Sequence, residues 1–277
     1  MKMTMITISG LLIAGGLLVL SLIGLVWTPY DPTVMKIASR LEPPSLSHLL
    51  GTDHFGRDIL SMIMSGGSVT LLVALAAVAI GMSIGTPLGI LAASRHHGKF
   101  DDTVMRMNDL IFAFPALITA VLITARFGPG MINAVIAIGL FNIPVFARIA
   151  RSAALPVWHR DFILAARLAG KSTLRIASGH VLRNILPILL VQATIQFSLA
   201  ILAEAGLSYI GLGVQPPQAS WGRMLADSQT LVQLAPHTVL VPGLTILFAV
   251  LGFNLIGESL GKSLGRRFAA KTRGAAS

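Results

Sequence analysis

Long stretches without a charged residue constrain this chain more than any other feature of its sequence. A helix needs about 20 apolar residues to cross the hydrocarbon core of a membrane. Only 12% of the 277 residues are charged, whereas a soluble domain has about 25%. The sequence therefore predicts an all-α integral membrane protein, a single transmembrane domain over residues 1–277. Its six predicted spans lie near residues 8–27, 69–93, 107–126, 131–150, 185–206 and 237–257.

The first apolar run extends from Met3 to Tyr30. It is longer than the apolar region of a secretory signal peptide, and it has no clear small-x-small cleavage site. We therefore expect it to be an uncleaved first span near Ile8–Trp27.

Lysines and arginines predict the orientation of the spans. With the N-terminus inside, the cytoplasmic segments hold fifteen of these residues and the outer segments five, and Arg106 lies at a span edge. Cytoplasmic loops are enriched in Lys and Arg, so we expect both termini and the loop 151–184 in the cytoplasm. Segments 28–68 and 208–236 are then outer loops, rich in glycine and proline and expected to follow a turn-rich, non-helical path. The basic residues form no single soluble face, so no nucleic-acid partner is predicted.

The loop between the fourth and fifth spans has a recognisable local pattern. Asp161 is a candidate N-cap for a short helix over Phe162–Ala169, and Gly170 is a residue of the type that often ends a helix. Ser172 can cap a second helix that continues towards Pro187. From these residues alone, the segment is either an element that couples to a partner or an ordinary basic loop.

Small residues and prolines within the spans indicate how the helices pack. Gly81, Gly85 and Gly89 recur every four residues and share one helix face, a spacing that lets two backbones approach closely. Pro87, Pro115 and Pro144 can bend their helices. Ordinary bundle packing explains these residues, and a translocation hinge is the alternative.

Catalytic and metal-binding sites are not indicated. The chain has no cysteine, and its histidines form no ligand cluster: His96 and His97 suit a polar turn, and His54 suits a structural loop position. Lys171-Ser172 and Lys262-Ser263 each follow a glycine but lack the earlier glycine of a phosphate-binding loop, so any ATPase must be a separate subunit.

The few charges near the spans suit local pairing or contact with the membrane interface. These are Glu204, Asp109 and Arg106. None is a mid-span carboxylate, which a proton-coupled carrier usually needs.

Three long motifs occur in order at matching topological positions. They are GTDHFGRD after the first span, EAGLSYIGLGVQPPQASWG after the fifth and FNLIGESL in the sixth. With FGPG at 127–130 and the Asp161 loop, they resemble the second permease subunit of the dipeptide, oligopeptide and nickel ABC importers. The resemblance covers about residues 28–260.

This resemblance implies a type I (MetI-like) permease bundle in the bacterial inner membrane, with a cytoplasmic coupling helix. It implies four kinds of partner: a second homologous permease, two ATP-binding subunits that hold ATP and magnesium, an extracytoplasmic substrate-binding protein and the lipid bilayer. The residues implied to couple to the ATPase are Arg160, Asp161, Ala165, Ala166 and Gly170. The outer-loop motif residues are Gly51, Thr52, Asp53, Gly56, Arg57, Asp58, Gly211, Gly213, Pro216, Pro217, Trp221 and Gly222.

The chain departs from the family pattern in three places. Leu164 replaces the glutamate of the coupling motif, the tail GKSLGRRF lacks the usual ending, and the arm before the first span is short. The short arm favours a nickel or metal-chelate member, whereas the family as a whole also carries small peptides. The alternative function is a self-contained channel or secondary carrier, which would not depend on a neighbouring ATPase.

Overall fold

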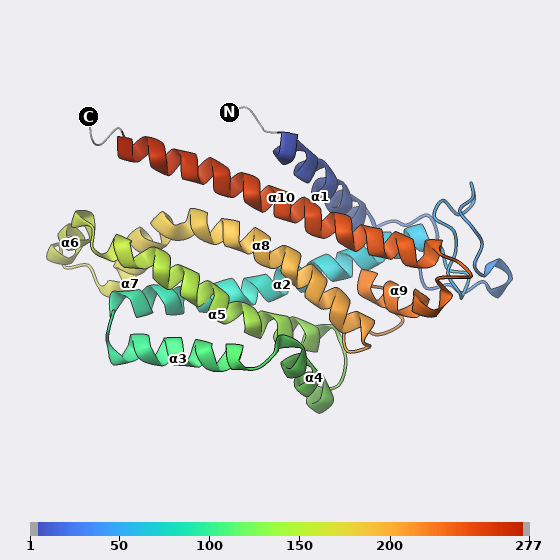
Figure 1. Ribbon diagram of the computed structural model, residues 1–277, viewed down its shortest axis with the longest axis horizontal. Helices are drawn as coiled ribbons and strands as arrows, with labels where there is room; N and C mark the ends of the chain where they lie inside the picture. The colour runs from blue at the N-terminus through green and yellow to red at the C-terminus, as the bar shows by residue number, and fades with distance from the viewer. Residues whose placement is uncertain (1–4, 274–277) are drawn as a thin grey trace. The chain divides into compact units, whose positions relative to one another are not determined.

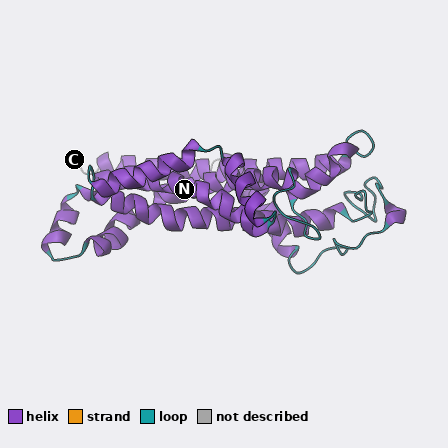
Figure 2. Ribbon diagram, turned by 90° about the horizontal axis from the view of Figure 1, so that it is seen from below, coloured by secondary structure: helices purple, strands orange, loops and turns teal. Residues whose placement is uncertain are grey.

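A computed structural model of the chain describes residues 5–273, and the side chains of residues 8–263. This part of the chain contains helices and loops but no strand (Figures 1 and 2), so the predicted all-α class is confirmed. The elements are α1 (Met5–Ile23), η1 (Ile37–Ser39), α2 (Ile59–Ser94), α3 (Lys99–Ala113), α4 (Ala116–Phe127), α5 (Met131–Trp158), α6 (Asp161–Leu168), α7 (Thr173–Ile176), η2 (Ala177–Val181), α8 (Leu182–Tyr209), α9 (Trp221–Ser228), η3 (Gln229–Leu231) and α10 (His237–Arg273).

Each of the six predicted spans overlaps an apolar helix, but only four or five of the described helices have the length and composition of a membrane span. Four of the described helical stretches are long and apolar enough to cross a membrane, and they contain α2, α5, α8 and α10. The bent pair α3–α4 corresponds to the third prediction, and the shorter apolar helix Ile8–Ile23 corresponds to the first.

The third predicted span, 107–126, is a broken pair of helices. The axes of α3 and α4 differ by 82°, and the break lies at Phe114-Pro115. A residue before proline is pushed out of the helical region, and Phe114 is extended with φ −96° and ψ 131°. Pro115 therefore bends its span, as predicted, whereas Pro87 and Pro144 lie inside continuous helices.

Both predicted outer loops contain helical residues, so the expectation of non-helical paths over 28–68 and 208–236 was wrong in part. Helix α2 already begins at Ile59, where the carboxylate of Asp58 accepts a hydrogen bond from the Ser61 amide at 2.8 Å. In the second segment, Ser220 caps α9 by accepting from the Arg223 amide at 3.2 Å. These local caps provide partners for amides that a helix start leaves unpaired.

The chain groups into two compact units, each assembled from three separate stretches. Unit 1 contains residues 1–76, 117–138 and 197–256, and unit 2 contains 77–116, 139–196 and 257–277. Helices α2, α5, α8 and α10 each contribute residues to both units.

The core of unit 1 is built around the indole of Trp221, which is fully buried. Its N–H donates to the carbonyl of Ile63 at 3.0 Å. A Cβ on Gly67 would lie 2.8 Å from the Trp221 ring, and one on Gly222 would lie 2.5 Å from the Cα of Ala205. Glycine at these two positions thus allows α2 and α8 to pack directly against α9 and the tryptophan.

In unit 2, the predicted glycine stripe of α2 packs directly on α5. A Cβ on Gly81 would overlap Asn142, and one on Gly89 would overlap the backbone of Ala147. Gly85 meets the same stretch of α5 between these two points. The stripe therefore lets the two backbones approach closely, as its spacing predicts.

Candidate functional site

Within unit 2, the short helix α6 contacts α5 through Trp158, the last residue of α5. The Trp158 indole is buried and its N–H donates to the carbonyl of Ile90 at 3.2 Å. The guanidinium of Arg167, on α6, lies 5.6 Å from the centre of that ring. Figure 1 shows α6 lying beyond the end of α5. A force on α6 therefore acts directly on α5 and, through Trp158, on α2.

One face of α6 packs on the chain and the other is free. Ile163 and Ala166 are buried, while Leu164 is 51% exposed and Leu168 is 90% exposed. Ala165 is also exposed. The sequence grouped the two alanines of the motif, but the structure separates them, because Ala166 is buried against this chain and Ala165 is exposed.

The C-terminus of α6 is closed by a Schellman motif. The amide of Gly170 donates to the carbonyl of Arg167 at 2.9 Å, and the amide of Lys171 donates to that of Ala166 at 3.1 Å. Gly170 has φ +73°, in the left-handed region that favours glycine. The prediction that this glycine ends the helix is confirmed.

The N-terminal ends of α6 and α7 differ from the prediction in detail. Arg160 occupies the N-cap position of α6, and Asp161 is its first helical residue, so the N-cap assignment of Asp161 was wrong by one position. Its carboxylate in the first turn still interacts favourably with the helix dipole. Ser172 does precede α7, but its side chain makes no capping hydrogen bond.

An apolar pocket of about 150 Å³ lies between α2 and the α7–η2 segment. The π-helical turn η2 joins α7 to α8. The pocket leaves α7 without close packing over part of its contact with α2. It is lined by Thr86, Pro87, Ile90, Leu91, Leu174, Ala177, Ser178 and Leu182.

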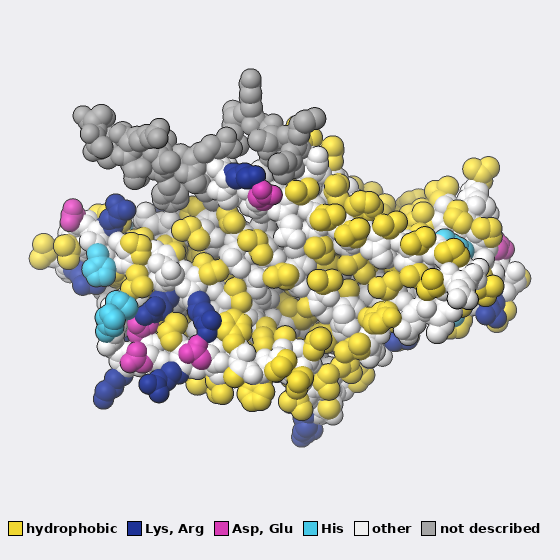
Figure 3. Space-filling view, in the orientation of Figure 1, with side chains coloured by type: hydrophobic (Ala, Val, Ile, Leu, Met, Phe, Trp, Pro, Cys, Tyr) yellow, Lys and Arg dark blue, Asp and Glu magenta, His cyan; other side chains and the backbone are white. Residues whose placement is uncertain are grey.

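Charged side chains gather where α3 begins and α5 ends (Figure 3). The buried carboxylate of Asp101 accepts two hydrogen bonds from Arg151, at 2.5 and 2.6 Å, and lies 3.2 Å from His96. Asp109 pairs with Arg148. The predicted local pairing of Asp109 is thus confirmed, and these contacts tie α3 to α5.

In unit 1, the GTDHFGRD motif forms a tight turn held by Asp53. One carboxylate oxygen accepts from the amides of Phe55 and Arg57, at 2.9 and 2.8 Å. The other accepts from Nε of Arg57 at 2.7 Å, and the second guanidinium nitrogen lies 2.6 Å away as an ion-pair contact. Thr52 is buried and donates to the carbonyl of Ser39 at 2.5 Å.

Two further motif residues fix this turn to other residues of unit 1. Gly56 has φ +75°, and a Cβ there would overlap the carbonyl of Lys36. Gly51, with φ +80°, lies against Glu42 and His237 in the same way.

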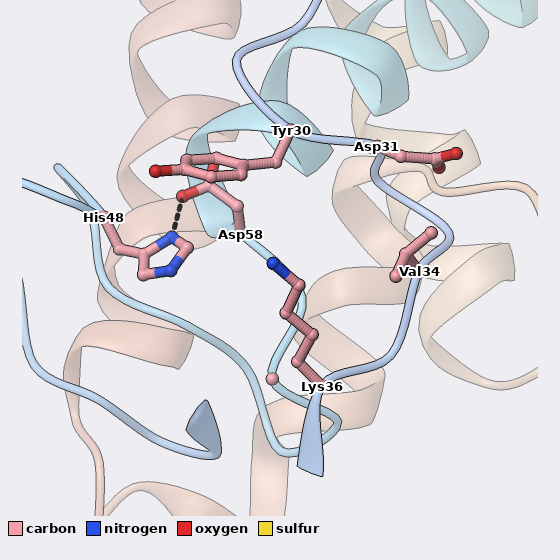
Figure 4. A pocket seen from close by; sticks show the side chains of 7 residues that line it. Tyr30, Asp31, Val34, Lys36, His48 and Asp58 are labelled. Carbon is pink, nitrogen blue, oxygen red and sulfur yellow. Dashed lines mark hydrogen bonds and ion pairs between the residues drawn. The ribbon is translucent and has the colours of Figure 1, made fainter. Parts of the chain in front are cut away.

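A pocket of about 160 Å³ opens beside the turn. Asp58 lies at its wall and pairs with Nδ1 of His48 at 2.9 Å. In Figure 4 the Tyr30 ring lies beside this pair, with its centre 4.6 Å from that of the His48 ring. The Lys36 ammonium lies 5.8 Å from the centre of the Tyr30 ring. On the rim, hydrogen bonds from the side chain and amide of Thr33 lower the pKa of Asp31.

The second motif surrounds a fully buried carboxylate, that of Glu204. It accepts hydrogen bonds from Thr70 at 3.0 Å and from Ser208 at 2.6 Å. Ser208 also accepts from the amide of Val214 at 3.1 Å. The predicted local pairing of Glu204 is confirmed, and its complete burial was missed. The i, i+4 spacing of Glu204 and Ser208 was the available clue.

The remaining residues of the second motif shape the chain around that carboxylate. Gly211 has φ +82°, and a Cβ on Gly213 would overlap Ser208. The peptide bond Pro216-Pro217 is cis. The GTDHFGRD motif and the motif that begins at Glu204 thus act within unit 1 as fold-determining turns.

No group of three histidine, aspartate or glutamate residues within 8–263 is placed to hold a metal ion. His96 and His97 lie in a turn with their ring centres 3.8 Å apart. His54 is partly buried in the GTDHFGRD turn.

Comparison with known protein families identifies the family to which this chain belongs. Residues 85–270 match the family described as binding-protein-dependent transport system inner membrane component. The chain belongs to this family. Its membership confirms the predicted class of ABC-importer permease and disfavours the self-contained channel or carrier.

Curated relatives extend the match over most of the chain. The dipeptide transport system permease protein DppC of Alkalihalophilus pseudofirmus is 39% identical over 95% of this chain and 86% of its own length. The nickel transport system permease protein NikC of Escherichia coli is 36% identical over 84% of each chain. Among solved structures, an inward-facing methionine ABC transporter, MetNI, has a similar fold with a TM-score of 0.59 at 19% identity, covering 72% of this chain and 94% of that one. The predicted MetI-like fold is confirmed.

Proposed function

We propose that this chain forms half of the translocation pore of an ATP-driven bacterial importer. A related but distinct permease supplies the other half, and two separate subunits hydrolyse ATP. A substrate-binding protein delivers the solute to segments 28–58 and 208–236. Both termini and the loop 151–184 lie in the cytoplasm, in agreement with the distribution of basic residues. Membership of a binding-protein-dependent transport family supports this assembly.

The exposed apolar face of α6 is the observation that carries the proposal. Leu164 and Leu168 are four residues apart, so they lie on one side of the helix. Such exposed leucines on an eight-residue helix, beside the exposed Ala165, suit a groove on a partner protein. Movement of the ATPase would then reach α5 and α2 through Trp158, which switches the pore by rigid-body motion of the helices.

Di- and tripeptides are the solutes we propose. The di/tripeptide transport permease DppC of Pseudomonas aeruginosa is 43% identical over 85% of this chain, whereas the nickel permease of Escherichia coli is 36% identical over 84%. Nickel or a metal chelate is the second candidate, because a nickel permease is among the relatives.

Co-purification and uptake test the proposal together. Tagged chain extracted in mild detergent is expected to bring down two ATPases and a second permease. The same complex in proteoliposomes, supplied with its binding protein, should import labelled dipeptide only with ATP. A chain that purifies as a homo-oligomer and transports without ATP refutes the assembly.

A matched pair of variants tests the docking surface. Leu168→Asp is expected to release the ATPases, because it places a charge on the apolar face of α6. Leu46→Asp is the control. Leu46, in the 28–58 segment, is 100% exposed and Leu168 is 90% exposed, so Leu46→Asp should leave the ATPases bound. Equal retention of ATPases by both variants contradicts docking through α6.

A further inference from the structure

Three side-chain amides form a hydrogen-bonded ladder in unit 2. Nε2 of Gln196, on α8, donates to Oδ1 of Asn142, on α5, at 2.6 Å. One turn earlier on α8, Nε2 of Gln192 donates to Oε1 of Gln196 at 3.3 Å. Asn142 and Gln196 are buried, and Gln192 is partly exposed at the surface of the chain. The ladder thus leads from the interior of unit 2 to its surface.

The ladder lies at the depth of the membrane centre. Asn142 is near the middle of the predicted span 131–150, and Gln192 and Gln196 are near the middle of 185–206. Moving an amide from water to hydrocarbon without a partner costs about 4–8 kcal/mol. A partly exposed glutamine at this depth is therefore not stable against lipid tails, and the face that carries Gln192 must meet water or protein.

The inner end of the ladder is held rigidly. A Cβ on Gly81 would overlap Asn142, so α2 packs directly behind that residue. Asn142 accepts from Gln196, and Gln196 in turn accepts from Gln192. This relay fixes the outer amide in one orientation. Within residues 8–263, the carbonyl oxygen of Gln192 has no hydrogen-bond partner.

We propose that this amide ladder forms a polar wall of the translocation pathway. Gln192 there offers a free carbonyl and a second N–H to the N–H and C=O groups of a peptide-type solute, which replace water as partners. The inference rests on the proposed function, because it requires that this chain line the pore. Amides that only join helices satisfy one another, whereas Gln192 keeps its hydrogen-bonding capacity at the surface.

Thiol accessibility tests the proposal directly, because the chain has no cysteine of its own. Gln192→Cys is assembled into the full importer in proteoliposomes and treated with a charged, water-soluble methanethiosulfonate. Leu190→Cys is the control, since Leu190 is 49% exposed but lies about 200° around the helix. Gln192→Cys is expected to react at least tenfold faster, and dipeptide with binding protein is expected to slow it. Equal rates in every nucleotide state overturn the proposal.

A transport measurement separates a pathway role from a structural one. Gln192→Leu is expected to lower dipeptide uptake about tenfold while the ATPases still co-purify, and Gln192→Asn is expected to restore part of the rate. Unchanged uptake by Gln192→Leu overturns the proposal, as does loss of the assembled complex. If the native complex shows no ATP-driven uptake, the proposed function fails. If uptake is normal and Gln192→Cys stays unreactive, only this inference fails.

Discussion

Replacing Gly170 with valine isolates the conformation of the turn after α6. Gly170 has φ +73°, and a Cβ added there meets no atom within 4 Å. The substitution therefore introduces backbone strain without a steric clash. A coupling role for α6 requires that it keep its present angle to α7, and this turn sets that angle.

The size of the effect follows from the left-handed backbone. A non-glycine residue in this region costs about 1–2 kcal/mol, which corresponds to a factor of about 5–30 in the population of the native turn. For valine this energetic cost lies at the upper end of the range or above it, because β-branched residues are rare outliers in the left-handed region. Asparagine tolerates the left-handed region better. Gly170→Asn is therefore expected to destabilise the turn much less than Gly170→Val.

The assay compares ATP hydrolysis with dipeptide uptake in proteoliposomes. Gly170→Val is expected to lower the ratio of uptake to hydrolysis by about the same factor of 5–30, with normal insertion into the membrane. Gly128→Val is the control, because Gly128 has φ +87° and equally open surroundings in the α4–α5 connection. Wild-type coupling in Gly170→Val, or an equal loss in Gly128→Val, refutes the reasoning.

Three further perturbations test the packing of the units. Gly85→Leu is expected to destabilise the chain by about 1–3 kcal/mol through overpacking. The measurement is the melting temperature in detergent. Gly15→Leu is the control, because its added side chain enters open space and should leave the melting temperature unchanged. Trp221→Ala should cost about 3–5 kcal/mol, since the indole is fully buried; an unchanged melting temperature would contradict its central position. Asp53→Ala leaves the buried guanidinium of Arg57 without its main partner and should cost about 3 kcal/mol. Asp53→Asn, which keeps a hydrogen-bond acceptor, should cost less in the same measurement.

Local features of the sequence predicted most of the helical framework. The apolar runs located the long apolar helices α2, α5, α8 and α10 and the bent pair α3–α4, because crossing a membrane requires a long uncharged helix. Gly170 predicted the turn that ends α6, because a left-handed backbone conformation strongly favours glycine. The Gly81, Gly85 and Gly89 spacing predicted close contact along one face. These features are readable because each depends on neighbours within a few residues.

Other features depended on residues far apart in the chain. The burial of Glu204 requires Thr70, which is 134 positions away. The amide ladder joins Gln196 to Asn142, which is 54 positions away. Within α6, packing on the rest of unit 2 decides that Ala166 is inside and Ala165 outside.

The sequence alone determined the fold class, the positions of the apolar helices and the family, because length, hydropathy and motif order are properties of the chain itself. The tertiary structure alone decided which polar side chains meet between the packed helices and which face of α6 is exposed. The reason is physical. A buried polar side chain must find a hydrogen-bond partner wherever the fold provides one, and nothing in the local sequence names that partner.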